Sequence, residues 1–407
     1  MKDLLETSCG LDVHKEKIVA CILTGPLGKP THSEIREFST LIPDMIALRD
    51  WIVSQNCHHV AMESTGIYWM PIYEILEDAF SGDITLLVVN ARHMKNVPGK
   101  KTDMRDSEWI STLLRAGLLN GSFIPEKRIR EFRDLNRYRK SIIRDITSQK
   151  NRIEKFLQSS GFRLSSFISD IFGASGRNII LHLIEHGQID RTALDSCLKT
   201  KTRNRIDEIL MSVNGTLSEH QKAFLKILMN HYDSLKEHLN EIEKDLEQDM
   251  EPFTLQVEQL NSIYGISTTA SCAIIAEIGV DMKPFKTAEH ICSWAGLCPG
   301  NNESAGKRKS TSVTKGNPYI KSMLCEIAWV IAGKRNTYLS AWYWRIKQKK
   351  GAKKAIVALA RKLLVIIYTM LKQGTVFDES CFEVRRKNCE QKQLSRYIRN
   401  WRNMVIM

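Results

Sequence analysis

Four acidic residues in the first quarter of the chain stand out because of their positions in the local pattern. Asp12 interrupts an otherwise apolar strand segment (CGLDV), and Glu63 ends another one (HHVAME). Asp103 and Asp106 follow in KTDMRD, three residues apart, so on a helix they would share one face. Acids placed at a first strand, at the end of a middle strand and on a following helix can converge at one edge of an α/β sheet.

Such a set of acids indicates metal chemistry. Four clustered carboxylates would repel one another unless divalent cations were bound, and oxygen ligands of this kind suit Mg²⁺ or Mn²⁺. Two such ions about 4 Å apart can stabilise both the attacking and the leaving oxygen of a phosphoryl transfer. The basic residues Lys100, Lys101 and Arg105 would hold a phosphate backbone close to the ions.

Each acid also has an ordinary structural explanation. Asp12 could lie at a solvated strand end, and Glu63 could be favoured by a helix dipole. Asp103 could cap a helix, and Asp106 could lie on a solvated helix face. The metal-site hypothesis therefore depends on the four acids taken together.

The elements that must position these acids alternate between strand and helix patterns. Strands are predicted over residues 9–24 (with a turn at 14–16), 34–39, 59–63 and 84–89, and helices over 41–54 and 68–79. A hairpin followed by strands that alternate with helices predicts a mixed sheet in an α/β fold.

Beyond residue 125 the pattern becomes helical. Residues 220–247 show coiled-coil spacing, with apolar side chains at Leu228, Tyr232, Leu235, Leu239, Ile242 and Leu246. The repeat lasts fewer than three heptads, so it could pair with the preceding helix in an antiparallel hairpin or with a second copy of the chain. The role of residues 160–215 is not assigned from the sequence.

Basic residues predict a polyanionic partner. The formal net charge is +13, which favours nucleic acid or an acidic membrane surface. The segment 127–155 is crowded with Arg and Lys, interleaved with Phe132 and Tyr138. This combination favours a nucleic-acid face over a merely solvated helix face, and the candidate residues are Arg130, Arg133, Arg137 and Arg144. A second candidate patch consists of Lys347, Lys349, Lys350, Lys353 and Lys354.

The order D…E-x-T-G…K-T-D-x-x-D, carried by the four acids, resembles the RuvC-like DEDD domain of the IS-one-ten family of insertion-sequence transposases. A later G-L-x-P followed by E-S-x-G resembles the second landmark of that family, so the resemblance covers about residues 7–375. It implies a ribonuclease H-like (RuvC-like) domain over 1–124, a helical and coiled-coil linker region over 125–254, a mostly helical transposase domain over 255–375 and a basic tail over 376–407.

The resemblance also implies a nucleophilic serine at Ser304, in the loop 296–316 that is rich in Gly, Asn and Ser. A serine in such a loop is most often a turn residue, and the nearby Ser310 and Ser312 could compete for the role. Here the basic residues Lys307, Arg308, Lys309 and Lys315 could neutralise phosphate and developing charge. The metal cluster would be the activator of the serine hydroxyl.

The function that follows from the resemblance is DNA transposition. The implied enzyme cuts and rejoins donor and target double-stranded DNA under the guidance of a structured noncoding bridge RNA, and it works as a dimer or tetramer. Two alternatives remain open: a RuvC-like, metal-dependent, structure-specific endonuclease that needs only the acids, and a non-catalytic nucleic-acid-binding protein.

The ten cysteines include no C-x-x-C pair, which disfavours a zinc finger and fits reduced thiols. The first residues lack an apolar signal segment, and no apolar run is long and uncharged enough to span a bilayer. We therefore expect a soluble protein of the bacterial cytoplasm with no membrane partner.

Overall fold

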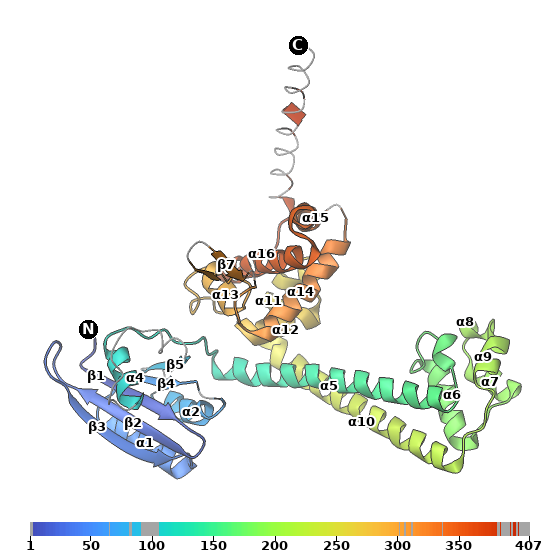
Figure 1. Ribbon diagram of the computed structural model, residues 1–407, viewed down its shortest axis with the longest axis horizontal. Helices are drawn as coiled ribbons and strands as arrows, with labels where there is room; N and C mark the ends of the chain where they lie inside the picture. Colours follow the sequence, from blue (N-terminus) through green and yellow to red (C-terminus); the bar gives the residue numbers. More distant parts are fainter. Residues whose placement is uncertain are drawn as a thin grey trace. The chain divides into compact units, whose positions relative to one another are not determined.

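The computed structural model describes residues 3–64, 66–80, 84–90, 106–300, 302–304, 307–310, 312–335 and 337–380, together with residues 383, 391, 394, 395 and 398. The chain divides into two compact units, residues 1–124 and 125–407 (Figure 1).

The first unit is built on a five-stranded mixed sheet. Its strand order is β3-β2-β1-β4-β5, in which β1, β2 and β3 pair antiparallel while β4 runs parallel to β1 and β5 parallel to β4. The strands are β1 (Thr7–Val13), β2 (Lys17–Thr24), β3 (His32–Ser39), β4 (His59–Glu63) and β5 (Thr85–Val89). The predicted mixed sheet is confirmed, and its strand order is the one expected of a ribonuclease H-like fold.

Helices cover both faces of this sheet, because side chains along a strand alternate between its faces. Leu11 and Met62 belong to the larger core, with helices α1 (Ile42–Ser54) and α2 (Trp69–Phe80). Ala61 and Val89 belong to the smaller core on the opposite face, under α4 (Asp106–Arg115).

The backbone of helix α4 packs closely against β1, and Gly10 makes this contact possible. A Cβ atom at Gly10 would lie 2.1 Å from the Ser107 carbonyl oxygen and 2.5 Å from the Ser111 amide nitrogen. One turn further along α4, the Ser111 hydroxyl donates to the Ser8 carbonyl at 2.9 Å. Glycine at this position therefore lets the helix backbone rest directly on the strand.

The second unit contains a long helical hairpin, visible in Figure 1 as the green α5 (Lys127–Ser159) and the yellow-green α10 (Glu219–Met250). Arg139 binds Glu243, the Gln149 amide donates to the Leu228 carbonyl, and the Phe156 and Phe224 rings lie 5.3 Å apart. Along these three contacts the residue numbers increase on α5 and decrease on α10, so the two helices are antiparallel. The coiled-coil seam is thus used within the chain, and the residues Tyr232, Leu235, Leu239, Ile242 and Leu246 are buried.

The unassigned region 160–215 forms a small helical cap at the far end of this hairpin (Figure 1). Its core includes Ile179, Leu194 and Ile209, and Arg177 forms a two-pronged hydrogen bond with Asp233 of α10 at 2.6 and 2.8 Å. Its elements are η1 (Leu164–Ser166), α6 (Ala174–His186), α7 (Arg191–Cys197), α8 (Thr200–Arg203) and α9 (Ile206–Ser212).

The C-terminal part packs several helices around α16 (Ala352–Gln373), whose Leu359, Leu363 and Ile367 are fully buried. Helix α16 packs against α11 (Thr254–Asn261), α13 (Ala288–Trp294), α14 (Pro318–Gly333) and α15 (Tyr338–Lys350). The same part of the chain contains η2 (Glu251–Phe253), α12 (Thr268–Ile278) and the strands β6 (Asn302–Ser304) and β7 (Lys307–Ser310). Among the residues described, no helix has the length and apolar character needed to cross a bilayer.

Gly10→Ala should destabilise the protein, because the new methyl group would force α4 away from β1 and disrupt two backbone contacts. We expect a loss of about 1–3 kcal/mol, typical of an overpacked core, in calorimetric unfolding of the full chain. Gly333→Ala is the matched control, since a Cβ there meets nothing within 4 Å. Equal stability of the two variants would contradict this account of the contact.

Candidate active site

The structure brings two of the predicted acids together on neighbouring strands. Strands β1 and β4 pair in parallel with Gly10 opposite Ala61 and Leu11 opposite Met62. Continuing that register by one residue sets Asp12 beside Glu63, on strands about 4.8 Å apart. Both acids thus lie at the carboxyl ends of parallel strands, an edge where α/β folds commonly hold their ligands.

Both acids also face the side of the sheet that α4 covers. Ala61 packs under α4, and Gly10 contacts it, so the residues two positions further on, Asp12 and Glu63, share that face. Ser8 is hydrogen-bonded to Ser111, and Gly10 packs against the Ser107 carbonyl. Residue numbers therefore increase along β1 as they decrease along α4, so the two elements run antiparallel. The first residue of α4, Asp106, therefore lies toward the same edge of the sheet.

The Asp12 side chain is held in place by His14. Its carboxylate is 14% exposed, and its Oδ2 lies 3.1 Å from Nε2 of the exposed His14. Glu63 is half-buried, and Asp106 is exposed at the first turn of α4. Sequence reasoning assigned His14 only to a turn. The signal that could have identified it is its spacing of two residues from Asp12, which puts both side chains on one face.

These oxygen donors are of the kind that a divalent hard cation prefers. In the described part of the chain, no group of three His, Cys, Asp or Glu side chains already converges closely enough to hold an ion. The fourth predicted acid, Asp103, and the basic residues Lys100, Lys101 and Arg105 lie outside the described residues. The register of β1 and β4 sets two of the four predicted acids side by side, and the metal site as a whole stays a prediction.

The described residues on either side of Ser304 form backbone hydrogen bonds across the loop predicted for residues 296–316. The Asn317 amide donates to the Trp294 carbonyl at 3.0 Å, that of Thr314 to Cys298 at 2.9 Å, and that of Gly300 to Ser312 at 2.9 Å. Strands β6 and β7 continue this pairing until Ser304 lies opposite Lys307. Within the predicted loop, the described residues therefore pair as two antiparallel arms, which we call the β-ribbon, and Ser304 lies at the outer end of β6. The sequence did not indicate this pairing, because it depends on backbone hydrogen bonds.

Two glycines allow the base of the ribbon to close. A Cβ at Gly316 would lie 2.2 Å from the Gly296 amide nitrogen and 2.5 Å from the Trp294 carbonyl oxygen. Gly296 itself has a positive φ of 68°, a conformation that favours glycine. The side chains of Ser304, Lys307, Arg308 and Lys309 lie outside the description, whereas Lys315 is exposed.

A buried ionic network anchors the ribbon to the long helix α5. Glu277 of α12 is 2% exposed, and its carboxylate accepts two hydrogen bonds from Arg137, both at 2.8 Å. The same carboxylate accepts from the Asn317 amide group at 2.6 Å. Asn317 ends the ribbon, and its Oδ1 accepts from the amides of the first turn of α14, so one carboxylate links α5, α12, the ribbon and α14.

Arg133 completes this network. Its guanidinium donates to the backbone carbonyls of Ala276 and Glu277 at 3.0 and 2.7 Å. Burial lowers the Arg133 pKa to about 10 although the Glu277 charge opposes that shift, so Arg133 remains protonated at neutral pH. For Arg137, burial also acts to lower the pKa, but the hydrogen bonds and charge of Glu277 outweigh it and the pKa is raised.

The four arginines predicted to bind nucleic acid therefore differ in their surroundings. Arg133 and Arg137 are engaged inside the protein, and Arg130 is partly buried, with one donor on the Pro125 carbonyl at 2.9 Å. Arg144 is exposed on the same helix. Sequence reasoning missed the partner of Arg137 because Glu277 lies 140 residues away along the chain.

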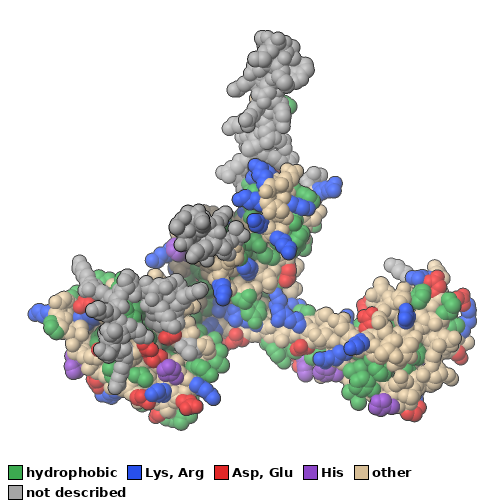
Figure 2. Space-filling model, viewed as in Figure 1, with side chains coloured by type: hydrophobic (Ala, Val, Ile, Leu, Met, Phe, Trp, Pro, Cys, Tyr) green, Lys and Arg blue, Asp and Glu red, His purple; other side chains and the backbone are tan. Residues whose placement is uncertain are grey.

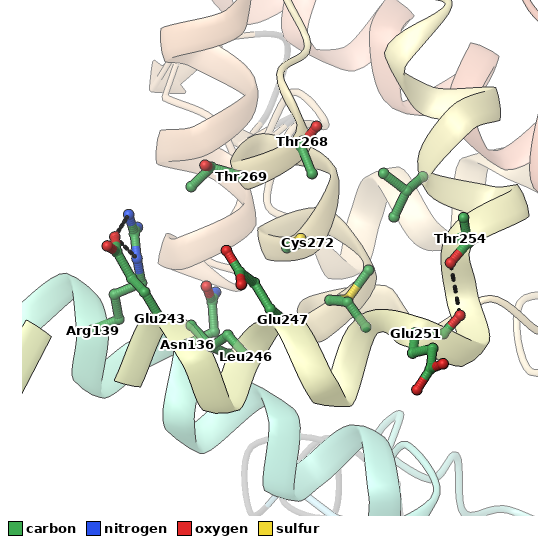
Figure 3. A pocket seen from close by; sticks show the side chains of 12 residues that line it. Asn136, Arg139, Glu243, Leu246, Glu247, Glu251, Thr254, Thr268, Thr269 and Cys272 are labelled. Atoms are coloured by element: carbon green, nitrogen blue, oxygen red, sulfur yellow. Dashed lines mark hydrogen bonds and ion pairs between the residues drawn. The ribbon is translucent and has the colours of Figure 1, made fainter. Parts of the chain in front are cut away.

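A cavity of about 420 Å³ lies between α5, α10, α11 and α12 (Figure 3). Its wall includes Glu243, Glu247 and Glu251, and Arg139 pairs with the first of these. On the opposite side lies Cys272, whose pKa is raised by burial. Its acidic wall is unsuited to nucleic acid, so the cavity is distinct in character from the basic surfaces predicted above.

Two family models match the chain. One, described as a transposase model and named for the DEDD domain of IS110, matches residues 9–161 and spans all four predicted acids. The other, described as "Transposase IS116/IS110/IS902 family", matches residues 257–344 and spans the β-ribbon with Ser304.

Individual relatives carry related names. The chain is 20% identical over 44% of its length to a "Probable family 20 transposase" of Pseudomonas aeruginosa. It is 32% identical over 30% of its length to a "Pilin gene-inverting protein" of Moraxella bovis. It is 22% identical over 68% of its length to a "Putative transposase y4qE" of Sinorhizobium fredii. The matched stretches span 54%, 39% and 60% of these relatives, so the chain covers about half of their length.

Arg137→Met should strongly destabilise the second unit, because it leaves the Glu277 charge buried without its main partner. We expect a loss of about 3 kcal/mol in denaturant unfolding. Arg144→Met on the same helix is the matched control and should change stability by less than about 0.5 kcal/mol. Comparable losses in both variants would show that Glu277 does not depend on Arg137.

Proposed function

Because the chain belongs to the IS110 family of transposases, we propose that it is a DNA recombinase that cuts and rejoins DNA strands. The observation that carries this proposal is the placement of Asp12 and Glu63, side by side at the carboxyl ends of two parallel strands and on the face covered by α4. Two neighbouring carboxylates repel each other, and a divalent cation bound by both would relieve that repulsion. The gene-inverting name of the Moraxella relative agrees with strand exchange as the reaction class.

We propose Asp12, Glu63, Asp103 and Asp106 as the ligands of Mg²⁺ or Mn²⁺. Asp12 and Glu63 supply oxygen donors from the sheet, and Asp106 supplies one from the start of α4. When bound, such a cation would neutralise negative charge on the phosphate that reacts. His14 fixes the direction of the Asp12 carboxylate through its contact with Oδ2.

We further propose that Ser304 is the nucleophile. Its hydroxyl oxygen would attack a DNA phosphorus, so that a phosphoserine ester forms while the bond to one deoxyribose oxygen breaks. The proton lost by the serine would reach that leaving oxygen through solvent, and a DNA hydroxyl would reverse the step during rejoining. The place of Ser304 at the outer end of the β-ribbon, opposite Lys307, supports this role.

The proposed partners are donor and target duplexes, a structured noncoding guide RNA and further copies of the chain. Exposed Arg144 and Lys315 supply positive charge for phosphate backbones, and Lys307, Arg308 and Lys309 occupy β7. Holding two duplexes in one complex favours a dimer or tetramer.

The second candidate function is an endonuclease that uses only the acids. Metal-dependent hydrolysis of DNA would need the acidic edge of the sheet and no serine nucleophile.

Asp12→Asn and Glu63→Gln should each reduce DNA strand cleavage at least 100-fold while DNA binding changes less than threefold, since each removes a metal-binding charge and leaves the surface intact. Cleavage of a labelled donor with Mg²⁺ and the flanking RNA would measure this. Glu37→Gln, which alters an exposed acid on the edge strand β3, is the control. Full activity in the Asp12→Asn protein would rule out the acidic edge as the metal site.

Ser304→Ala should abolish a covalent protein–DNA adduct. Donor DNA, target DNA, RNA and Mg²⁺ would be incubated with the protein and resolved on a denaturing gel, beside Ser312→Ala as a control in the same ribbon. An adduct that only the Ser304→Ala protein lacks supports the serine mechanism. Cleaved ends without any adduct, equal in both variants, would instead establish the metal-only endonuclease.

A further inference from the structure

The C-terminal helices expose aromatic side chains that the proposed cleavage chemistry does not use. Trp329 on α14 is 54% exposed, Tyr264 before α12 is 49% exposed, and Trp344 on α15 is 44% exposed. Val330, next to Trp329, is 52% exposed. A group of large apolar side chains in contact with solvent commonly marks a binding surface.

These residues gather around the C-terminal end of α14, where the buried Tyr343 packs between the two tryptophans. A Cβ at Gly265, next to Tyr264, would lie 3.3 Å from a Val330 methyl group. On the other side, the Trp344 indole donates to the Ala332 carbonyl at 3.2 Å. The rings of Trp329 and Trp344 are bridged by Tyr343, at 6.4 and 5.5 Å between centroids. We name Tyr264, Trp329 and Trp344 the aromatic platform.

Cations accompany the platform. Lys334 Nζ lies 3.6 Å from the centroid of the Tyr264 ring, and Lys347 Nζ lies 4.0 Å from that of Trp344. Arg335 and Arg345 are exposed close by in the sequence. Between residues 317 and 373 the sequence has only one acid, Glu326, so the helices that carry the platform are strongly basic. The face seen in Figure 2 mixes Lys and Arg with hydrophobic side chains over these helices.

The combination of exposed rings and neighbouring cations suits one kind of occupant. A duplex offers phosphates but hides the faces of its bases, so it would satisfy the cations and leave the rings uncovered. Unpaired bases stack on aromatic rings whatever their identity, while their phosphates contact cations. A symmetric contact between two copies is disfavoured, because it would bring Lys334 and Lys347 toward their own equivalents.

We propose that the aromatic platform binds unpaired bases of a single-stranded stretch of nucleic acid, with Trp329 as the main stacking ring and Lys334 and Lys347 as phosphate contacts. This inference rests on the proposed function, in which strands are separated and exchanged. The unpaired strand could belong to DNA or to RNA, since base faces and phosphates are common to both. Lys334 and Lys347 keep the adjoining rings covered by a cation until phosphate draws the ammonium groups away.

The test compares binding of labelled single strands of about 20 nucleotides, in DNA and RNA arms, with binding of the duplex of the same sequence. We expect Trp329→Ala in the full chain to weaken single-strand binding about tenfold, equivalent to about 1.4 kcal/mol, with duplex binding changed less than twofold. Trp329→Phe should restore most of the affinity because it keeps a ring. Tyr264→Ala should give a smaller loss in the same direction.

Met211→Ala is the control, because Met211 is 72% exposed in the helical cap, away from the platform residues in the fold. Whichever arm loses affinity identifies the strand as DNA or RNA. Unchanged single-strand binding in Trp329→Ala would overturn the proposal. So would an equal loss of duplex binding, or a Trp329-dependent self-association in sedimentation experiments.

Failure of this inference is separable from failure of the proposed function. Binding is measured without cleavage, and Asp12→Asn should bind single strands as the unaltered protein does. A protein that stacks single strands but never cuts DNA would disprove the recombinase proposal and leave the platform standing. Normal DNA cutting together with unchanged single-strand binding in Trp329→Ala would support the recombinase proposal and overturn the aromatic platform.

Discussion

The Glu277 carboxylate joins the parts of the second unit that the chain order keeps apart. Glu277 belongs to α12, and its carboxylate accepts hydrogen bonds from Arg137 of α5 and from Asn317 at the end of the β-ribbon. A carboxylate buried to this degree needs such partners to be stable. The ribbon therefore extends from a fixed base, and the position of Ser304 depends on an interaction made at the opposite end of the ribbon.

In the first unit the corresponding constraint is steric. Gly10 lets the α4 backbone approach β1, and the serine contacts around it fix the direction of the helix. Because α4 is antiparallel to β1, its N-terminal end lies toward the edge where Asp12 and Glu63 leave the sheet. A bulkier residue at Gly10 would therefore affect both the packing and the arrangement of the acids.

The two kinds of basic side chain in this protein perform different tasks. Partly buried arginines such as Arg133 and Arg137 hold helices together, since their planar groups match carboxylates and carbonyls. Exposed cations such as Arg144 and Lys315, and the half-buried Lys347, have no ion pair with an acid among the described residues and can bind phosphate. A net charge of +13 therefore overstates the number of cations that are available to a nucleic acid.

The sequence by itself determined the sheet, because alternation and apolar runs fix which face of each strand is buried. It also determined the helical seam of α10 and the strand positions of Asp12 and Glu63. Only the tertiary structure decided that the seam is satisfied within the chain, that Arg137 is bound to Glu277, and that described residues between 296 and 316 pair as a ribbon. These features arise from contacts between residues far apart in the chain or between backbones, and local residue patterns carry no information about such partners. The aromatic platform was missed for the same reason, since exposure of Trp329 follows from how α12, α14 and α15 pack together.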